Sequence, residues 1–466
     1  MMDTVQAFLD IVNIFFVLYL IGYSTFLFLS VVIGASDLYL DKEMEYLQNK
    51  LSQNYYVPVS ILVPAYNEEV TVVETVRSLL ALNYKLYEII ILDDGSKDKT
   101  SEKLIEAFHM QPVFRPIHKQ LFSQPAEAIY ECHSEKVPIT LVRKKNGGKA
   151  DSLNTGINCA RYPYFICMDA DSCLQDDSLE RIVHPLLENK NVVAVGGSVR
   201  PANGIRIQNG HVVQYQLPKN LLACMQALEY DRSFLAARIL LDKFNGNLII
   251  SGAFGLFEKK TVIAAGGYDT NTTGEDMELV IRLHEFCRLN QRPYKIKYAP
   301  DAVCWSQAPE HLRDLSKQRK RWQRGLFQSL WSHREMFANP RYGAVGMISY
   351  LYFLLYELLS PYIEIIGMIT ILVSIVMDML NLRYMAFYFI AYALYSALLS
   401  VTAFFSRIHT IDVKFTFKDF CKSLLLCLFE ITFLRFYLAI VRATAFIGYK
   451  KNRLSWDKLE RKRLNH

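Results

Sequence analysis

Two groups of aspartates directly follow short, apolar, β-branched stretches of the chain. The pair Asp93-Asp94 follows one such stretch, and Asp169-Ala170-Asp171 follows another. Two carboxylates spaced by one residue at the end of a strand can hold a hard divalent cation and leave coordination positions for phosphate oxygens. The second group therefore predicts a metal site. The first group is weaker evidence, because an aspartate before a glycine is also common in ordinary turns.

A glycine turn that carries a lysine lies between these two groups. The segment Asn146-Gly147-Gly148-Lys149 is expected at the start of a helix, where backbone N–H groups and the Lys149 ammonium can bind a diphosphate. It lacks the earlier glycine and the Ser/Thr of a P-loop, and no Gly-x-Gly-x-x-Gly follows the first apolar stretch. The turn therefore does not indicate an ATP or dinucleotide site.

Two further groups of polar residues are expected on helices. Glu275 and Asp276 open an amphipathic stretch, where acidic residues also commonly stabilise the helix dipole. Farther on, Gln318, Arg321 and Trp322 share one face of a basic helix by their i, i+3, i+4 spacing. The alternative for this helix is simple adsorption to anionic lipid next to the membrane segments.

The elements that position these residues form an α/β pattern between Pro58 and Trp305. Near-continuous apolar stretches, separated by amphipathic helical stretches, predict a mostly parallel sheet that is covered on both faces. In such sheets ligands bind beyond the carboxyl ends of the strands, where the polar groups above lie. Ser251–Phe257 is expected to be a strand of small residues that a ligand can approach closely. The apolar stretches are residues 59–63, 88–92, 164–168 and 192–195.

The overall composition indicates a protein that is part globular and part membrane-embedded. Of the 466 residues, 52% are hydrophobic and only 21% are charged, and the mean hydropathy is +0.11. These values exclude a disordered chain, a collagen-like repeat and a disulfide-rich scaffold. The nine cysteines include no Cys-x-x-Cys and indicate a reducing compartment. The net charge of +6 is too small to argue for nucleic acid.

Residues 11–35 form an uncharged apolar run that is long enough to cross a bilayer. Asp3 and Asp10 precede it, whereas Lys42 and Lys50 follow it. The positive-inside rule then places the N-terminus outside and the following domain in the cytoplasm.

Three more apolar regions follow near the C-terminus, at residues 343–377, 385–405 and 421–449. Charged residues at membrane depth are costly, so those in these regions are expected to face a protein-lined or watery interior, with snorkelling to the interface as the alternative. Three simple crossings would place the basic tail outside, against the positive-inside rule, so the number of crossings and the side of the C-terminus stay open. The residues concerned are Glu357, Glu364, Glu430, Arg435 and Arg442.

Taken in order, these motifs resemble those of the membrane-integrated family 2 glycosyltransferases, which include cellulose, hyaluronan and bacterial poly-N-acetylglucosamine synthases. Asp93-Asp94, Asp169-Ala170-Asp171, Gly274-Glu275-Asp276 and the Q-x-x-R-W segment 318–322 carry the resemblance. It implies a division into an N-terminal transmembrane anchor (1–40), a cytosolic domain of the GT-A fold (55–310), an amphipathic interface helix (311–342), α-helical transmembrane segments (343–449) and a basic tail (450–466). The size and the single N-terminal pass most resemble the poly-β-1,6-N-acetylglucosamine synthase branch.

The resemblance also implies roles for individual residues. Asp94 would bind the nucleoside part of a nucleotide sugar, and Asp169 and Asp171 would place Mg²⁺ or Mn²⁺ on its diphosphate. Asp276 would be the general base towards the acceptor hydroxyl, with Glu275 beside it. The remaining expected substrate contacts are Lys149, Arg321 and Gln318 to the diphosphate and Trp322 to the terminal sugar of the acceptor.

The implied function is an inverting, processive transfer at the plasma membrane. A UDP-sugar donor, UDP-N-acetylglucosamine or UDP-glucose, would extend a growing β-linked polysaccharide that passes across the lipid bilayer and out of the cell. A small membrane accessory subunit is compatible with this function, and nucleic acid is not an expected partner. The main alternative is a non-processive enzyme that adds one sugar to a lipid acceptor. A non-catalytic transporter or assembly subunit would require the acidic motifs to be accidental.

Overall fold

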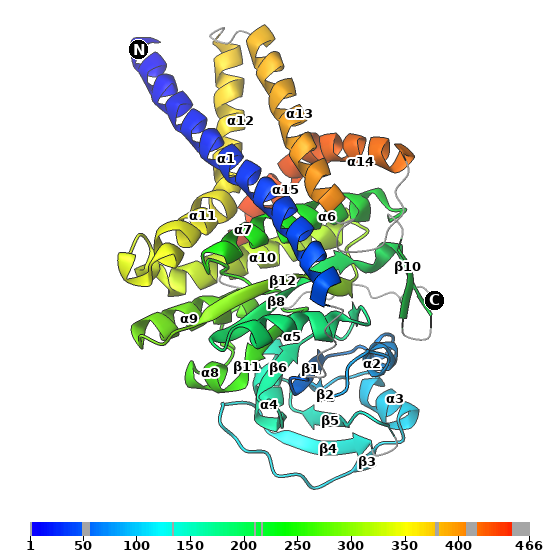
Figure 1. Cartoon of the computed structure of the whole chain (residues 1–466). Coiled ribbons are helices and arrows are strands. Elements are labelled where there is room, and N and C mark those ends of the chain that lie inside the picture. Colours follow the sequence, from blue (N-terminus) through cyan, green and yellow to red (C-terminus); the bar gives the residue numbers. More distant parts are fainter. Residues whose placement is uncertain are drawn as a thin grey trace.

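A mixed β-sheet forms the core of the lower part of the molecule (Figure 1). The structure, a computed structural model, describes residues 2–48, 56–132, 135–208, 211–215, 218–377, 382–406 and 417–449. Within them, ten strands form one sheet in the order β3 (Gln111–Pro112), β4 (Ala126–Cys132), β5 (Ile139–Lys144), β2 (Tyr87–Asp93), β1 (Val59–Ala65), β6 (Tyr164–Cys167), β11 (Gly255–Glu258), β8 (Val192–Pro201), β12 (Lys295–Ser306) and β7 (Cys173–Leu174). A separate hairpin pairs β9 (Ile205–Gln208) with β10 (His211–Tyr215).

The prediction of a mostly parallel sheet is correct for the central strands, but the sheet as a whole is mixed. Strands β5, β2, β1 and β6 run parallel to one another, and β12 is parallel to β8. By contrast, β4 is antiparallel to β5, and β11 is antiparallel to both β6 and β8. After β8 the chain leaves the sheet for a helical excursion. It then re-enters at the edge where β6 and β8 end, so β11 runs in the opposite direction.

Helices cover both faces of the sheet, which explains why its central strands are apolar throughout. Ile61 and Val63 of β1 pack in one core with α2 (Val72–Leu80), α3 (Thr100–Ala107) and α5 (Ser178–Glu188). Leu62 points to the other face and packs with α4 (Lys149–Cys159), α8 (Lys259–Ala264) and α9 (Glu275–Leu289). The predicted strand positions in β1, β2, β6 and β8 are confirmed.

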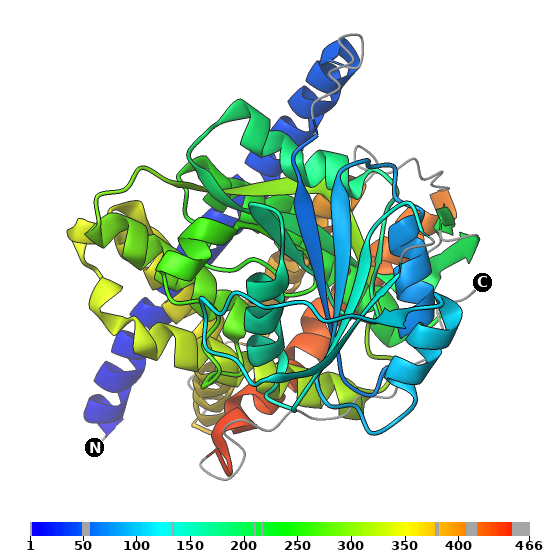
Figure 2. The same cartoon turned by 90° about the horizontal axis from the view of Figure 1, so that it is seen from below.

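A layer of helices lies between this domain and three projecting helices. The layer contains α6 (Leu221–Arg232), the π-helix η2 (Ser233–Ala237), α7 (Arg238–Lys243) and α10 (Leu312–Ser332). Of the amphipathic helix expected over 311–342, α10 covers the part up to Ser332. In Figure 1, α1 (Met2–Gln48), α12 (Ser360–Val376) and α13 (Leu382–Ser406) extend upward from this layer. Seen from below, α1 runs diagonally behind one side of the domain and emerges at both ends (Figure 2). The remaining helical elements are η3 (Arg334–Met336), η4 (Pro340–Tyr342), η5 (Val345–Ser349), α11 (Tyr350–Tyr352), η6 (Phe353–Leu358), α14 (Phe417–Phe429), η8 (Glu430–Leu434), α15 (Arg435–Ala443) and η9 (Thr444–Phe446).

One described helix, Ile11–Tyr39 within α1, is long and apolar enough to cross a membrane by itself. The pair Val345–Leu358 and Ser360–Val376 passes the same test together but bends by 49° at the break. Pro361 lies in the first turn of α12, directly after this bend, where its missing N–H removes no helical hydrogen bond. Met385–Leu399 is a shorter apolar helix.

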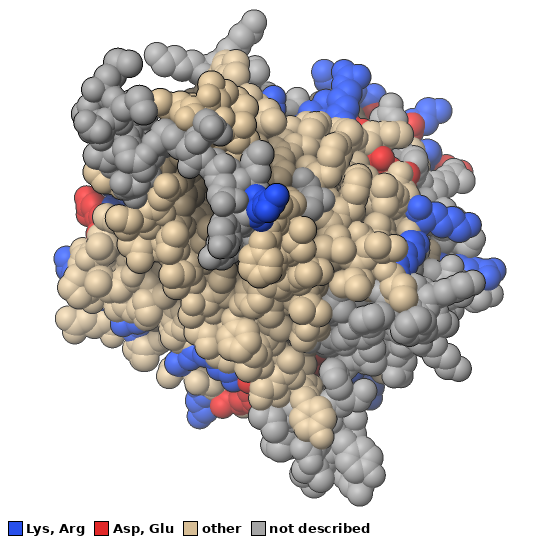
Figure 3. Space-filling view, turned by 90° about the horizontal axis from the view of Figure 1, so that it is seen from above, with Lys and Arg blue, Asp and Glu red and all other residues tan. Residues whose placement is uncertain are grey.

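The projecting helices expose rows of large apolar side chains. Seen from above, the described part of this face is mostly uncharged, and Lys and Arg gather towards its margins (Figure 3). Such a surface is unfavourable in water and favourable in lipid. The exposed side chains include Ile11, Ile14, Leu18 and Ile21 of α1, Ile366, Ile369, Leu372 and Val376 of α12, and Phe387, Ile390, Leu394 and Leu398 of α13. The predicted basic tail, 450–466, lies outside the described residues.

Candidate active site

A cavity of about 480 Å³ opens at the carboxyl edge of the sheet and continues between the helices above it. It brings together seven of the nine residues predicted from the sequence: Lys149, Asp169, Glu275, Asp276, Gln318, Arg321 and Trp322. Asp94 and Asp171 are not among the residues that line it. The site thus joins three strand and helix ends of the sheet domain to one face of α10.

Lys149, the first residue of α4, forms an ion pair at the floor of the cavity. Its Nζ lies 2.5 Å from Oδ1 of Asp169 and 3.8 Å from Oε1 of Glu275, and it also donates to the carbonyl of Gly252. Burial by itself would lower the pKa of Lys149, but the Asp169 and Glu275 carboxylates outweigh it and raise the pKa above its usual value. Lys149 is therefore a permanent positive charge at the floor of the cavity.

Asp276 is held by two backbone amides. Its Oδ1 accepts from the N–H of Met277 at 2.8 Å, and its Oδ2 accepts from the N–H of Gly252 at 3.1 Å. The neighbouring Glu275 is buried. Burial raises the pKa of Glu275, the nearby charge of Asp276 adds to this, and Lys149 opposes it. The two carboxylates at the start of α9 thus differ in environment, and Asp276 is the one that bridges α9 and residue 252.

The segment expected to be a strand over Ser251–Phe257 is one only from Gly255 onward. Before it the chain makes a turn in which the N–H of Phe254 donates to the carbonyl of Ser251. The turn frees the amide of Gly252 from the sheet, and that amide binds Asp276 instead. A Cβ at Gly252 would lie 3.1 Å from Nζ of Lys149, so a larger side chain would crowd the ion pair.

Asp94 does not line the cavity but binds the glycine turn at Gly147 and Gly148. It is buried, and its carboxylate accepts hydrogen bonds from the amides of Gly147 and Gly148 and from Nζ of Lys144. Gly148 has a φ of +89°, a conformation that favours glycine. The two amides suggested by the sequence for a diphosphate are therefore bound by Asp94, and the role of Asp94 in nucleotide binding stays a prediction.

The carboxylates predicted to bind a metal differ in their access to the cavity. Asp169 lines the cavity with 35% of its side chain exposed, whereas Asp171 is only 3% exposed. No group of three or more His, Cys, Asp or Glu in the described parts of the chain can hold a metal ion. Asp169 presents carboxylate oxygens to the cavity, which fits Mg²⁺ or Mn²⁺ because such ions bind oxygen ligands and keep several water and phosphate ligands. The role of Asp171 as a ligand stays a prediction.

Helix α10 is held against the loop before Asp276 by two residues that the sequence interpretation missed. A Cβ on Gly325 would lie 2.8 Å from the Cα of Gly274, so the two backbones are in direct contact. Oε1 of Gln328 accepts from the hydroxyl of Thr272 and from the hydroxyl and the amide of Thr273. A glycine inside a helix lowers helix stability by about 1 kcal/mol relative to alanine. A glycine at position 325 of a predicted helix therefore indicates a close backbone contact, and this reasoning could have identified Gly325 from the sequence.

Comparison with known proteins agrees with this arrangement. Residues 60–131 match the family described as "Glycosyl transferase family 2", and residues 119–325 match "Glycosyltransferase like family 2". The chain is 30% identical over 322 residues to the poly-beta-1,6-N-acetyl-D-glucosamine synthase of Staphylococcus epidermidis, covering 67% of each protein. The chain is a family 2 glycosyltransferase. It is also 29% identical over 326 residues to the synthase of Staphylococcus aureus (strain COL), covering 69% of this chain and 68% of the relative.

A solved structure confirms the GT-A-like character of the fold. The glycosyltransferase superposes with a TM-score of 0.52 on the mannosyltransferase PcManGT from Pyrobaculum calidifontis in complex with GDP-Man and Mn²⁺. The sequence identity is 18%, and the match covers 88% of this chain and 99% of the other.

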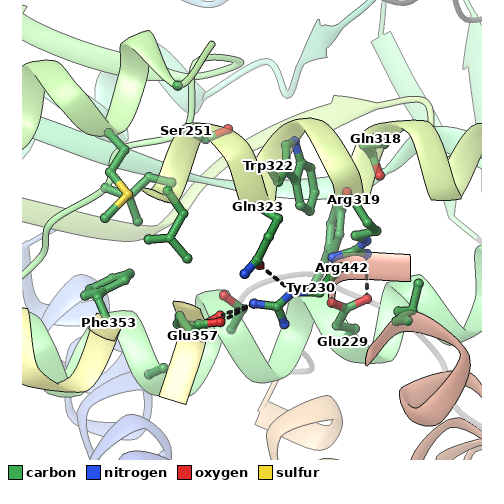
Figure 4. Close-up of a pocket in the computed structure, with 18 of the residues that line it drawn as sticks. Glu229, Tyr230, Ser251, Gln318, Arg319, Trp322, Gln323, Phe353, Glu357 and Arg442 are labelled. Carbon is green, nitrogen blue, oxygen red and sulfur yellow. Dashed lines mark hydrogen bonds and ion pairs between the residues drawn. The ribbon is translucent and has the colours of Figure 1, made fainter. Parts of the chain in front are cut away.

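The far end of the cavity in the glycosyltransferase is lined by charged side chains of the apolar helices. Glu357, Glu364, Glu430, Arg435 and Arg442 all line it, which confirms the expectation of a protein-lined interior. They form pairs. Arg435 lies 2.8 Å from Glu364, Glu430 makes a bidentate contact of 3.0 Å with Arg232 of α6, and Arg442 lies 3.8 Å from Glu357 and donates to its carbonyl (Figure 4).

Proposed function

We propose that this glycosyltransferase polymerises a UDP-sugar into a β-linked polysaccharide and moves the chain through its own helices to the outside of the cell. The observation that carries the proposal is the continuity of the cavity. The same cavity is lined by Asp169 and Asp276 at one end and by charged side chains of the apolar helices at the other. A single-step transferase needs no polar passage of this kind behind its catalytic carboxylates.

In the proposed reaction the acceptor hydroxyl oxygen attacks the anomeric carbon of the donor, and the bond from that carbon to the diphosphate breaks. Asp276 takes the hydroxyl proton as the general base. Lys149, Arg321 and Gln318 hold the diphosphate by charge and hydrogen bonds. Direct displacement inverts the anomeric centre, so an α-linked donor gives a β-linkage. Trp322 carries the terminal sugar, and Glu275 keeps Lys149 in place.

Asp169 and Asp171 are the residues that would hold Mg²⁺ or Mn²⁺. The bound ion would neutralise the negative charge that develops on the departing nucleoside diphosphate. This assignment rests on the carboxylate chemistry of the two side chains and on the opening of Asp169 to the cavity. Asp94 is proposed to act at the nucleoside end, through the glycine turn that it holds.

Two observations favour an uncharged sugar. The relatives are named as synthases of an N-acetylglucosamine polymer, which favours UDP-N-acetylglucosamine over UDP-glucose. In addition, the arginines and glutamates at the far end of the cavity neutralise one another in pairs. A passage without net charge suits a neutral glycan, whereas a polyanion would leave the glutamates unfavourably placed.

The same reasoning supports a multi-pass protein of the plasma membrane. We assign residues 1–40 to an anchor, 55–310 to the cytoplasmic catalytic domain, 311–342 to the interface and 343–449 to the membrane. The exposed apolar rows of α1, α12 and α13 support this assignment. Lys42 and Lys50 follow the apolar run and no Lys or Arg precedes it, which supports a catalytic domain on the cytoplasmic side, where UDP-sugars are available.

A panel of donors tests the proposal. Purified enzyme with Mg²⁺ or Mn²⁺ is given UDP-N-acetylglucosamine, UDP-glucose, UDP-galactose or UDP-glucuronate, and the products are sized and their linkages determined. The expected result is a long polymer from one uncharged donor. A single sugar attached to lipid would overturn the proposal in favour of the non-processive alternative, and polymer from UDP-glucuronate would overturn the choice of donor.

A further inference from the structure

Arg319, which lies between the recognised positions of the Q-x-x-R-W segment, is locked in one orientation. Its side chain is only 8% exposed, and its two terminal nitrogens donate to the two oxygens of Glu229 on α6 at 2.8 and 2.7 Å. A bidentate arginine–carboxylate contact fixes the plane of the guanidinium as well as its position. The pair therefore joins α6 to α10 and defines where the guanidinium plane lies.

The same guanidinium lies over the ring of Trp322. Its central carbon is 4.5 Å from the ring centroid, within the range of a cation–π contact. Arg319 and Trp322 are i, i+3 neighbours on α10, so their side chains lie on one face of the helix. Trp322 is 41% exposed and lines the cavity. In Figure 4, Arg319 lies between Trp322 and Glu229, so the contacts run from α6 through Arg319 to the indole.

This indole lies on the segment of α10 that connects the two ends of the cavity. Gly325, three residues after Trp322 on the same helix, contacts the loop before Asp276. The adjacent Gln323 accepts a hydrogen bond from Arg442 at 2.8 Å and donates to the carbonyl of Leu358. An acceptor that extends from Asp276 towards Arg442 therefore passes Trp322. An aromatic ring held in one orientation can stack on a sugar at a smaller cost in side-chain entropy than a mobile ring.

We propose that Glu229 and Arg319 are positioning residues that hold Trp322 as a platform for the acceptor and thereby set the length of the polymer. The inference rests on the proposed function, since it assumes a growing chain in the cavity. Neither residue is proposed to bind the donor, because the contacts of Arg319 are with Glu229 and the indole of Trp322 and not with Lys149 or Asp169. The pair should thus affect how long the acceptor stays bound and leave donor binding unchanged.

Variants of the full-length enzyme can show whether the Glu229–Arg319 pair orients Trp322 or only stabilises the contact between α6 and α10. Glu229→Gln removes the charge that orients Arg319, and Arg319→Lys keeps a cation but loses the bidentate geometry. The double exchange Glu229→Arg with Arg319→Glu restores an ion pair between α6 and α10 but places a carboxylate against the indole. Arg313→Gln, at an exposed arginine of the same helix, is the matched control.

The readouts are polymer length, the KM for the donor and the thermal unfolding temperature of each variant. Glu229→Gln and the double exchange are expected to shorten the polymer roughly fivefold with an unchanged donor KM, and Arg319→Lys to give an intermediate length. The double exchange should recover the unfolding temperature lost in Glu229→Gln without recovering the length. Trp322→Ala should shorten the polymer as well, and adding Glu229→Gln to it should have no further effect.

Two results would overturn the inference. If the double exchange restores full polymer length, the Glu229–Arg319 pair only stabilises the contact between α6 and α10. If the donor KM rises while the length stays constant, the pair serves the donor. These outcomes differ from failure of the proposed function, in which the wild-type enzyme itself makes a single lipid-linked sugar and no polymer.

Discussion

At the scale of single residues, Asp276 is the group on which the proposed transfer depends most directly. Its carboxylate is oriented by the amides of Met277 and Gly252. Asp276→Asn keeps an oxygen for one of these amides but cannot take the acceptor proton. We expect kcat to fall by about 10²- to 10⁴-fold, with a nearly unchanged donor KM.

Release of the nucleoside diphosphate and incorporation of labelled sugar measure this effect. Glu102→Gln, at an exposed carboxylate of α3, is the control and should leave both rates unchanged. A variant Asp276→Asn that still builds polymer at the wild-type rate would show that another group accepts the proton, and the neighbouring Glu275 would then be the first candidate.

At the scale of elements, α10 contacts the loop that leads into α9 and Asp276, and we expect this contact to position the carboxylate. Gly325→Ala would place a methyl group 2.8 Å from the Cα of Gly274. Alanine improves the intrinsic helix propensity of α10 by about 1 kcal/mol, so a loss of activity cannot come from a weaker helix. We expect a loss of at least tenfold in kcat, an effect of about 1.4 kcal/mol on the transition state.

The control for this variant is Ser332→Ala, at an exposed position near the end of the same helix. Both proteins are compared by their activity and by the thermal unfolding temperature. Full activity of Gly325→Ala would show that the loop accommodates the methyl group and that the Gly274–Gly325 contact does not position the base.

The end of α10 is joined to α9 by a histidine that is sensitive to pH. His333 contacts Glu285 at 2.5 Å and Glu278 at 3.3 Å, and Glu278 also binds Arg282. Burial by itself would lower the pKa of His333, but the two glutamates outweigh it and raise the pKa. A raised pKa in the folded state means that the protonated histidine stabilises the fold below its unfolded pKa of about 6.5. This contribution is lost as the pH rises through the folded pKa.

We therefore expect His333→Gln to destabilise the protein most near pH 6, by about 1 to 3 kcal/mol, the range of hydrogen bonds to charged groups. The difference from wild type should shrink as the pH rises above neutrality. Thermal unfolding of both proteins between pH 5.5 and pH 9 measures it. A difference that is constant over this range would show that the histidine acts by packing and not by its charge.

The sequence predicted these elements well and the contacts between them poorly. The strand that ends at Asp93 and the start of the helix that carries Trp322 were predicted to within one residue, because apolar periodicity is a local property. The end of that helix was placed ten residues too late, at 342 and not at Ser332. The antiparallel direction of β11 depends on the path of the excursion before it. The capture of the Gly147 and Gly148 amides by Asp94 joins residues more than fifty positions apart, and no local pattern reports such a contact.

At the scale of the whole molecule, α10 contacts both the catalytic loop and the membrane-side helices. Oε1 of Gln328 accepts a hydrogen bond from the amide of Thr273 in the loop before Asp276, and its Nε2 donates to the hydroxyl of Tyr449. Ser316 lies 2.7 Å from the hydroxyl of Tyr437 in α15. One helix therefore supports both the loop before Asp276 and the charged end of the cavity, which gives the proposed passage and the proposed catalytic base a common frame.

Transport through this passage is the prediction that tests the whole arrangement. When the enzyme is reconstituted in liposomes and the UDP-sugar is added outside, only molecules with the catalytic domain facing outward have access to the donor. Their polymer should emerge inside the vesicles, because the cavity leads away from the catalytic carboxylates towards the paired charges of α12 and α15. Most of it should therefore resist a glycanase added outside and become sensitive after detergent.

The same polymer added outside empty vesicles must be digested, and encapsulated polymer must be protected, for the comparison to hold. Complete digestion before detergent would show that the chain leaves on the side where it is made. In that case the Arg–Glu pairs of the apolar helices would be stabilising contacts within the membrane, where each charge needs a partner because no water is available to solvate it. Protection of the product is therefore the outcome that distinguishes a passage from a set of buried ion pairs.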